Sequence, residues 1–446
     1  MLLIPMLQPR VVLRIAKSLT QEIEKDLKRT HDFAWERVGF SYSKSVQLEN
    51  GDWIVTIFDY QPVKDEDYVP DESCGAHINA DAIQVSLQRA YSDHIGSFHT
   101  HMHELSNSPG FSGTDIESLP EVAMAAQRYS KNEVHGLLLL GEKGLNALVI
   151  LPGSKELIEP ELVVSVGSPL SLNYISKPLT PGKTDRYDRQ SFLGKYTEDL
   201  FKRVKVAVVG LGGGGSHVVQ QLAHIGFQNY ILYDSDIVSD SNLNRLVGAK
   251  NKDVENKTLK FEVSKRVILG LQPIAKIEGK PCLWQEDIDT IKGADIVVGC
   301  VDGLATRRDL ESECRRYLIP YIDIGMDVYT GYDPPKMFGQ VQLSMPGNPC
   351  MNCTGYLSDE DLAEEADKYG VGGGRPQVVW PNAILASTAI GILIDLITGW
   401  SGDNRPLKYL DYLGNSGLIE ESIHMRHSQL RTCRHYPISN CGPIKW

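Results

Sequence analysis

A run of glycines between two apolar segments constrains this chain more than any other feature. The run, Gly210-Leu-Gly-Gly-Gly-Gly-Ser216, follows the apolar stretch 204–209 and precedes apolar residues at helical spacing over 216–225. Glycines between a strand and a helix permit a tight turn and let phosphate approach the N–H groups of the helix N-terminus. Such a run can also serve strand–helix packing alone, so its surroundings decide between the two interpretations.

Two further apolar stretches place this turn in a doubly wound parallel sheet. Residues 230–233 and 295–299 are predicted strands, and helical segments separate them from the first strand. The earlier of the two ends in Tyr233-Asp-Ser-Asp236, which places an acid about twenty residues after the turn, where the ribose of a nucleotide would lie. We therefore predict a Rossmann-like, doubly wound α/β domain that binds a nucleotide.

A proline-rich stretch, 169–185, separates this domain from a different upstream region. It has three Pro and one Gly without periodicity, which is typical of a linker. Upstream, apolar segments such as 53–58 mix with helical segments such as 80–92, which favours an α+β domain. The expected organisation is an N-terminal α+β domain at 1–166, a linker at 167–184 and the α/β domain at 185–446.

Composition excludes several classes of protein. The 446 residues carry 45 basic and 57 acidic side chains, a net charge of −12, which argues against a nucleic-acid partner. Eight cysteines are too few for a disulfide scaffold, so we expect a reducing, cytoplasmic location. Residues 1–5 are predicted to form an edge strand. The apolar run 383–400 contains Asp395 and is predicted to be a buried helix, so no membrane partner is expected.

Four motifs surround the predicted nucleotide turn. Arg186-Tyr-Asp-Arg-Gln190 precedes the first strand, and Ser241-Asn-Leu-Asn-Arg245 follows the second. Lys260 opens a helix, and Val301-Asp-Gly303 ends a later strand. Together these motifs resemble the ubiquitin-activating-enzyme-like (ThiF/MoeB-type) adenylyltransferases, the group that includes the activators of the sulfur carriers for thiamine and molybdopterin. The resemblance covers about residues 185–446.

The resemblance implies an ATP and Mg²⁺ site. The residues that would form it are Gly210, Gly212, Gly213, Gly215, Asp234, Asn242, Arg245, Lys260 and Asp302. In this assignment the glycines shape the phosphate turn, Asp234 holds the ribose and Asp302 binds Mg²⁺. Arg189 would reach the ATP of a neighbouring subunit, which implies a homodimer through this domain.

Elementary chemistry agrees with these roles. Attack of a carboxylate on the α-phosphate builds negative charge, which Arg245, Lys260 and Mg²⁺ would stabilise while pyrophosphate leaves. No general base is needed, because a carboxylate is already ionised. Lys257 also lies near the expected position, but Asp253-Val254 followed by 260–263 parallels the D-V…K-V-E-V pattern of the family, so Lys260 is preferred.

Cysteines near the C-terminus suggest a second metal. The segment Pro346-Gly-Asn-Pro-Cys350-Met-Asn-Cys353 resembles the P-G-x-x-P-C-x-x-C segment that supplies half of a structural zinc site in many of these adenylyltransferases. The usual second C-x-x-C is absent, so Cys433 and Cys441 are the expected remaining ligands. The alternative is that Cys353 is a nucleophile and that no zinc binds. Activators that pass their carrier on as a thioester need a free cysteine. If the four cysteines bind zinc, Cys282 is the least unfavourable candidate for that role.

The upstream region carries a histidine pair. His99-Thr-His101 follows the short stretch 95–98, so in a strand both imidazoles would project to one face and could share a metal. Phe111-Ser-Gly-Thr-Asp115 follows, and Glu36-Arg-Val-Gly-Phe40 lies upstream. This constellation resembles the JAMM-type metalloproteases (the JAB/MPN domain), deubiquitinases and their relatives, over roughly residues 10–165.

The second resemblance implies a catalytic zinc. Its ligands would be His99, His101 and Asp115, with Glu36 as general base and acid and Ser112 as an oxyanion donor. In one respect the sequence departs from the family.

Ten residues separate His101 from Ser112, more than is usual, and they include His103, which we expect to be a solvated loop residue. The alternative is an inactive scaffold of the same fold.

The two resemblances concern one kind of substrate. JAMM proteases cut at the C-terminal glycine of ubiquitin-like proteins, and the adenylyltransferases activate that glycine. The chain is therefore expected to be a bifunctional processing-and-activating enzyme, similar to fused proteins of bacterial ubiquitin-like modification systems. Its expected cofactors are ATP, Mg²⁺ and Zn²⁺. Its expected partner is a ubiquitin-like or sulfur-carrier protein with a C-terminal glycine, with a ubiquitin-conjugating-like enzyme as a further candidate.

Three alternatives remain. The chain could activate a sulfur carrier for thiocarboxylate formation, or the upstream domain could be a docking module without turnover. A dehydrogenase is the weakest alternative, because Ser241–Arg245 and Lys260 would then have no role.

Overall fold

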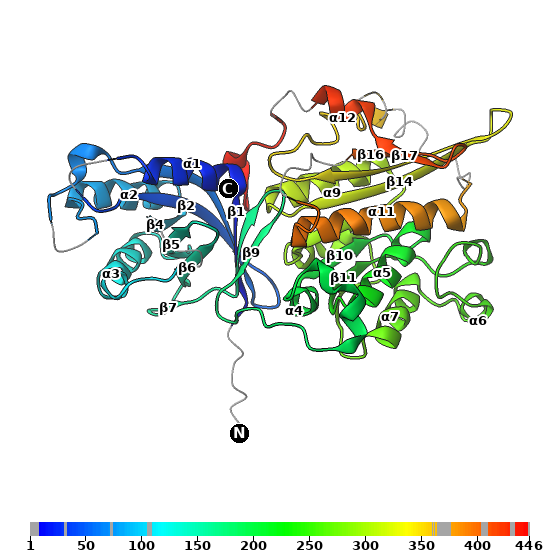
Figure 1. Cartoon of the computed structure of the whole chain (residues 1–446), viewed down its shortest axis with the longest axis horizontal. Helices are drawn as coiled ribbons and strands as arrows, with labels where there is room; N and C mark the ends of the chain where they lie inside the picture. Colours follow the sequence, from blue (N-terminus) through cyan, green and yellow to red (C-terminus); the bar gives the residue numbers. More distant parts are fainter. Residues whose placement is uncertain are drawn as a thin grey trace, which may run out of the picture. The chain divides into compact units, whose positions relative to one another are not determined.

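Two mixed sheets organise the chain, one in each of two units (Figure 1). Unit 1 comprises Met1–Pro178, Arg316–Leu318 and Pro437–Trp446, and unit 2 comprises Leu179–Arg315 and Ile319–Tyr436. The structure is a computed structural model that describes residues 9–30, 34–71, 75–104, 109–358, 360, 362–363, 376–402, 409–428 and 433–444. The edge strand predicted at residues 1–5 lies outside the described residues.

The sheet of unit 1 has nine strands. In order across the sheet they are β7 (Leu157–Ile158), β6 (Leu145–Ile150), β5 (His135–Gly141), β4 (Gly96–His103), β2 (Val38–Gln47), β3 (Trp53–Pro62), β1 (Val11–Ala16), β8 (Leu162–Val166) and β9 (Ser171–Tyr174). The helices are α1 (Lys17–Leu27), α2 (Ala80–Ser92) and α3 (Gly113–Tyr129), with short 3-10 turns η1 (Asp65–Asp67) and η5 (Ile438–Asn440). α3 packs on β4 and β5, and this contact places the N-terminus of α3 near β4. The expected α+β composition of this region is what the structure has.

The sheet of unit 2 has eight strands. In order they are β12 (Lys276–Lys280), β11 (Asn229–Tyr233), β10 (Lys205–Val209), β13 (Ile296–Gly299), β14 (Tyr321–Tyr329), β15 (Lys336–Ser344), β16 (Tyr409–Leu413) and β17 (Leu418–Glu421). The first five are parallel and the last three are antiparallel. The chain runs outward from β10 through β11 to β12 and returns to β13 on the other side, so the switch point lies between β10 and β13. The predicted Rossmann-like α/β domain is confirmed.

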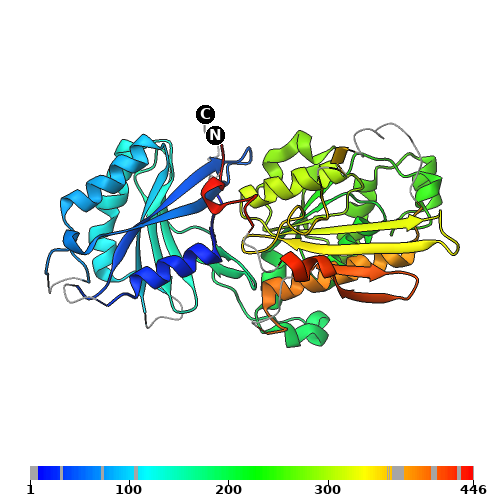
Figure 2. The ribbon, with the colours of Figure 1, turned by 90° about the horizontal axis from the view of Figure 1, so that it is seen from above.

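Helices and 3-10 turns connect these strands. They are η2 (Asp185–Leu193), α4 (Thr197–Arg203), α5 (Gly213–Ile225), η3 (Asp240–Asn242), α6 (Asn251–Glu255), α7 (Lys260–Leu271), η4 (Trp284–Asp287), α8 (Ile288–Ile291), α9 (Leu304–Arg316), α11 (Val379–Thr398) and α12 (Ile423–Ser428). α11 packs against α5 and against the β14–β15 hairpin, as both ribbon views show (Figures 1 and 2).

α11 is long and apolar enough to cross a membrane by length and composition, but 61% of its most apolar window is buried inside the protein. The buried helix predicted over 383–400 is therefore confirmed.

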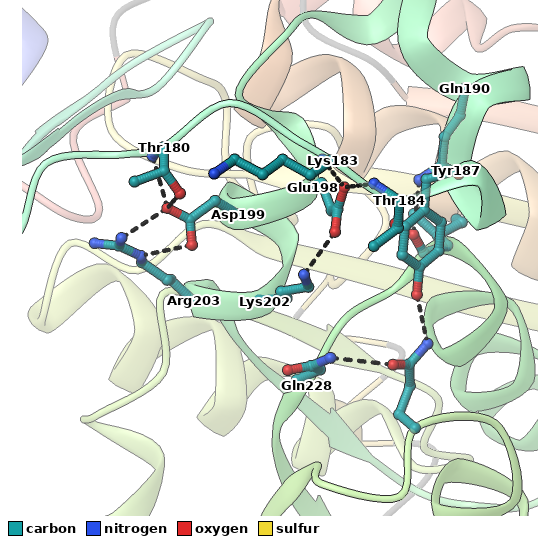
Figure 3. A network of polar contacts seen from close by, with 12 residues as sticks. Thr180, Lys183, Thr184, Tyr187, Gln190, Glu198, Asp199, Lys202, Arg203 and Gln228 are labelled. Atoms are coloured by element: carbon teal, nitrogen blue, oxygen red, sulfur yellow. Dashed lines mark hydrogen bonds and ion pairs between the residues drawn. The ribbon is translucent and has the colours of Figure 1, made fainter.

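The chain between the two sheets differs from the expected linker at 167–184. β9 lies within that range and pairs with β8 in unit 1. From Leu179 onward the chain belongs to unit 2, where the N–H groups of Lys183 and Thr184 donate to Glu198 Oε2 over 2.8 and 3.2 Å (Figure 3). Burial opposes ionisation of Glu198, but Lys202 and these N–H groups outweigh it and lower its pKa to about 2.

Candidate functional sites

A cavity of about 1510 Å³ opens in unit 2 at the carboxyl ends of the parallel strands, on both sides of the switch point. Of the residues predicted to bind ATP and Mg²⁺, those that line it are Gly210, Gly212, Gly213, Asp234, Asn242, Arg245, Lys260 and Asp302. They come from the loops after β10, β11 and β13 and from the start of α7. A parallel sheet therefore brings together side chains that lie far apart in the sequence.

The glycine turn is fixed by close backbone contacts. Gly210 has φ +87°, and a Cβ atom there would lie 2.5 Å from the carbonyl oxygen of Cys300. A Cβ atom on Gly215, in the first turn of α5, would lie 1.9 Å from the carbonyl oxygen of Gly210. Gly212, in contrast, has open space around it. Two of the glycines are thus needed for strand–helix packing, while the turn before α5 stays open to the cavity, where phosphate can meet helix N–H groups.

Two acids follow β11 beside this turn. Asp234 accepts hydrogen bonds from the backbone N–H of Leu211 over 2.7 Å and of Asp236 over 2.8 Å. Burial raises the pKa of Asp234, and the nearby Lys260 ammonium opposes that shift. Lys260 Nζ itself pairs with Asp236 Oδ2 over 2.6 Å. Lys257 lies in the preceding turn, with φ +50°, and is not among the residues that line the cavity.

The remaining polar residues of the cavity form a connected group. Arg245 donates from Nη1 to the carbonyl of Ser241 over 2.6 Å and from Nε to Gln377 Oε1 over 3.1 Å. Gln377 Nε2 lies 3.5 Å from Asp302 Oδ1. Asn242 Oδ1 accepts from the N–H of Ser239 over 3.0 Å, which fixes its side chain at the cavity wall. The sequence offered no motif that singles out Gln377.

Arg189 lies apart from the cavity. It is exposed on η2, as are Arg186 and Asp188, whereas Tyr187 and Gln190 of the same motif are partly buried. Tyr187 Oη accepts from Gln272 Nε2 over 2.8 Å, and Gln190 Nε2 donates to the carbonyl of Ile225 over 2.8 Å (Figure 3). The motif therefore presents Arg189 to the surface of unit 2. Cys282, the thioester candidate, lines the cavity, and burial together with nearby acids raises its thiol pKa.

Three of the four predicted structural zinc ligands meet in unit 2. The ligand atoms of Cys350, Cys353, Cys433 and His435 all lie within 4.8 Å of one another. His435 Nδ1 is 3.3 Å from the sulfur of Cys350 and 3.3 Å from that of Cys353. The neighbouring Cys350 thiol lowers the pKa of Cys433. Three sulfurs and one imidazole fit tetrahedral zinc.

The fourth predicted ligand, Cys441, is not a member of this group. It belongs to the C-terminal segment of unit 1, and His435 takes the fourth place. The structure thus differs from the expected four-cysteine site. The spacing Cys433-Arg-His435 is the sequence signal that could have indicated this histidine.

A second group of candidate metal ligands lies around β4 in unit 1. Polar atoms of Glu36, His101 and His103 lie within 4.8 Å of one another. Asp115 Oδ1 is 3.4 Å from His101 Nε2, and its Oδ2 is 3.6 Å from His103 Nε2. His101 is 1% exposed, and within the described part of the chain neither of its ring nitrogens has a hydrogen-bond partner. Buried imidazole nitrogens without partners, next to a carboxylate, fit zinc.

His103 corrects one expectation. The residue ends β4 instead of lying in a solvated loop, and its side chain is 26% exposed. β4 extends this far because it pairs with β5 up to His103, whereas its pairing with β2 ends at His101. His99 is also buried on β4, with its ring centroid 5.6 Å from that of His101.

Ser112 and Asp115 begin α3 as a capping box. The N–H of Ser112 donates to Asp115 Oδ2 over 2.7 Å, and the N–H of Asp115 donates to Ser112 Oγ over 3.2 Å. Burial opposes ionisation of Asp115, but His101 and the N–H of Ser112 lower its pKa. Burial raises the pKa of Glu36. A Cβ atom on Gly75 would lie 2.1 Å from Glu36 Oε1, so this glycine leaves room for the carboxylate.

Comparison with known proteins assigns a family. The ThiF family model matches residues 187–434, which is more than half of the chain. The SAMP-activating enzyme E1 of Haloferax volcanii is 30% identical over 231 residues, 50% of this chain and 80% of that protein. The molybdopterin-synthase adenylyltransferase of Escherichia coli is 30% identical over 40% of this chain and 70% of its own. The sulfur carrier protein ThiS adenylyltransferase of Escherichia coli is 29% identical over 38% and 70%. The chain therefore belongs to the ThiF family of adenylyltransferases.

Proposed function

We propose that this chain is a bifunctional enzyme of a ubiquitin-like protein pathway. Unit 2 adenylates the C-terminal glycine of a ubiquitin-like protein with ATP, and unit 1 cleaves at the C-terminus of such a protein with zinc. The observation that carries the first activity is the convergence of the glycine turn, Asp234, Arg245, Lys260 and Asp302 on one cavity. The second activity is supported by the group that Glu36 and Asp115 form with the histidines of β4.

In unit 2 the substrate carboxylate attacks the α-phosphorus of ATP, a new C–O–P link forms, and the bond to the β-phosphate breaks to release pyrophosphate. Arg245 and Lys260 stabilise the charge that grows on the phosphates. Lys260 exchanges Asp236 for a phosphate oxygen, since its ammonium already faces the cavity. Asp234 holds the ribose. Mg²⁺ bound by Asp302 would add charge neutralisation and orient the leaving pyrophosphate.

The substrate class rests on the relatives. Their names refer to a SAMP, to the sulfur carrier ThiS and to molybdopterin synthase. A protein partner with a C-terminal glycine is therefore proposed for this chain too. Activation of a sulfur carrier for thiocarboxylate formation is the second candidate, because these relatives include adenylyltransferases of sulfur carriers.

Two structural features support proposals about assembly. Arg189 is exposed on η2, which suits a residue that completes the ATP site of a second copy in a homodimer. The group of Cys350, Cys353, Cys433 and His435 would hold a structural zinc that ties the C-terminal segment of unit 2 to the chain that follows β15. Free thiols at these positions fit a cytoplasmic location.

In unit 1, zinc would be held by His101, by Asp115 and by a second histidine of β4. Zinc in such a site lowers the pKa of bound water from about 15.7 toward about 7 and polarises the scissile carbonyl. Glu36 accepts a proton from water and returns it to the leaving amine, and its raised pKa suits both steps. The hydroxyl of Ser112 accepts a backbone N–H, so its own proton is available to an oxyanion.

Pyrophosphate exchange tests the adenylation. The enzyme should exchange pyrophosphate into ATP only when a ubiquitin-like or sulfur-carrier protein with an exposed C-terminal glycine is present. The same carrier with its last glycine deleted is the matched control. Exchange without any carrier, or nicotinamide-dependent redox chemistry in place of exchange, would contradict the proposal.

A further inference from the structure

Three histidines on β4 offer two alternative metal sites. His99, His101 and His103 alternate along one strand, so all three side chains project to one face of the sheet. A metal held by two neighbouring histidines and Asp115 can use either the upper pair, His99 and His101, or the lower pair, His101 and His103. The sequence pattern is the same for both pairs, because each is a histidine, one residue and a histidine. The geometry is not the same.

Distances to Asp115 favour the lower pair. Donor atoms bound to one tetrahedral zinc, at bonds of about 2.0–2.2 Å, lie roughly 3.3–3.6 Å apart. Asp115 Oδ1 lies 3.4 Å from His101 Nε2 and Asp115 Oδ2 lies 3.6 Å from His103 Nε2, so the carboxylate faces both imidazoles at about that spacing, with one oxygen toward each. The ring centroids of His101 and His103 are 5.1 Å apart, closer than the 5.6 Å between His99 and His101.

The surroundings of this pair complete a hydrolytic site. Glu36 lies within 4.8 Å of both His101 and His103, as a base beside an open coordination position would. The N–H of Ser112 donates to Asp115 Oδ2 over 2.7 Å, which orients the carboxylate toward the histidines. Each element therefore holds one part of the site: β4 supplies the imidazoles, the start of α3 supplies the carboxylate, and the chain before β2 supplies the base.

His99 has a different environment. It pairs across the strands with Phe40 of β2, and the two rings meet edge to face with centroids 5.9 Å apart. It is not a member of the group formed by Glu36, His101 and His103. Its buried Nδ1 has no hydrogen-bond partner among the described residues, which is the observation that favours the upper pair. The experiment must therefore compare both histidines.

We infer that the zinc of unit 1 is bound by His101, His103 and Asp115, and that His99 is a packing residue behind this site. The inference rests on the zinc-dependent activity proposed for unit 1. It replaces His99, which the resemblance to JAMM-type proteases implies as a ligand, by His103. Glu36, which lies within 4.8 Å of both histidines, would stand beside the position left for water and the substrate carbonyl.

Metal content of the full chain tests the assignment. The wild type, His103→Gln, His99→Gln and Asp115→Asn are stripped with a chelator, reloaded with zinc, dialysed and measured by mass spectrometry of the metal. Because the cysteine group of unit 2 holds a second ion, the wild type should bind about two zinc ions per chain. His103→Gln and Asp115→Asn should bind about one, and His99→Gln about two. Retention of the second ion by His103→Gln, or its loss in His99→Gln, would overturn the assignment.

Two controls separate this outcome from other failures. His99 is buried, so His99→Asn is measured beside His99→Gln, and only variants with a wild-type unfolding transition are compared. Reloading with Co²⁺ distinguishes the sites, because the thiolate ligands of unit 2 give an intense charge-transfer absorption that the unit 1 site lacks. If cleavage of the tested substrates fails while His103→Gln still loses one ion, the proposed activity fails and the ligand assignment stands. If the wild type cleaves and His103→Gln keeps both ions, the proposed activity stands and the ligand assignment fails.

Discussion

The two units position their candidate residues in different ways. In unit 2 the residues lie in the loops that follow strands or at a helix start, so Asp234 after β11 and Lys260 at the start of α7 have places that the sequence pattern defines. In unit 1 the candidate ligands share one strand, and His99 and His103 are equivalent by spacing. The comparison teaches that a motif next to a turn or a helix start defines where its residues lie in the site. Histidines repeated at every second residue of a strand do not define which of them bind the metal.

One large expected effect breaks unit 2 alone. Lys260→Ala removes the cation that faces the phosphates, so carrier-dependent pyrophosphate exchange should fall by on the order of 10²–10³-fold. Cleavage by unit 1 should not change. Lys257→Ala is the matched control, because Lys257 does not line the cavity. Equal losses of exchange in the two variants would show that the effect of Lys260→Ala does not come from the place of Lys260 in the cavity.

The converse variant breaks unit 1 alone. Glu36→Gln keeps the shape of the side chain but removes the proton acceptor, so cleavage of a C-terminally extended carrier should fall by about 10²–10⁴-fold. Pyrophosphate exchange with a mature carrier should stay at the wild-type rate. Glu24→Gln, on α1, controls for the loss of a charge. Unchanged cleavage in Glu36→Gln would remove Glu36 from the mechanism.

A stability effect sharpens the account of the glycine turn. Gly215→Ala places a Cβ atom 1.9 Å from the carbonyl oxygen of Gly210, so the free energy of unfolding of unit 2 should fall by about 1–3 kcal/mol. In Gly214→Ala the nearest atoms lie 3.8 Å away, and that variant should unfold like the wild type. Chemical denaturation followed by tryptophan fluorescence measures both. Similar stabilities would mean that the turn relaxes.

The smallest effect concerns the contacts of Gln377. Without Gln377, Arg245 and Asp302 would have to be ordered when the nucleotide binds, and each lost hydrogen bond is worth about 1 kcal/mol. Gln377→Ala should therefore raise the KM for MgATP about fivefold with little change in kcat. Initial rates of exchange over a range of MgATP concentrations separate the two constants. A large fall in kcat would instead make Gln377 part of the chemistry.

Much of unit 2 could be predicted because buried parallel strands appear in a sequence as apolar runs. The stretches 204–209, 230–233 and 295–299 correspond to β10, β11 and β13. The candidate ATP residues that line the cavity came from motifs after these strands that resemble those of a known family. His435 could not be placed in this way, because a metal group closes through tertiary contacts between segments about eighty residues apart, as its contact with Cys353 shows.

Unit 1 was harder to predict in detail. β4 runs five residues beyond the stretch 95–98, because pairing with β2 extends it to His101 and pairing with β5 extends it to His103. Periodicity cannot report such long-range pairing. For the same reason β9 was assigned to the linker, and the segment Pro437–Trp446 was not expected to group with unit 1.

The most direct test of two linked activities is the intact mass of a ubiquitin-like protein with a C-terminal extension after incubation with the full chain. With zinc alone, the account predicts loss of the extension. With zinc and MgATP, it predicts loss of the extension followed by the added mass of AMP, and Glu36→Gln should yield neither product from the extended carrier. Two results would contradict the account. One is the addition of AMP to a carrier that still has its extension. The other is an extended carrier that stays unchanged while a mature carrier is not adenylated either.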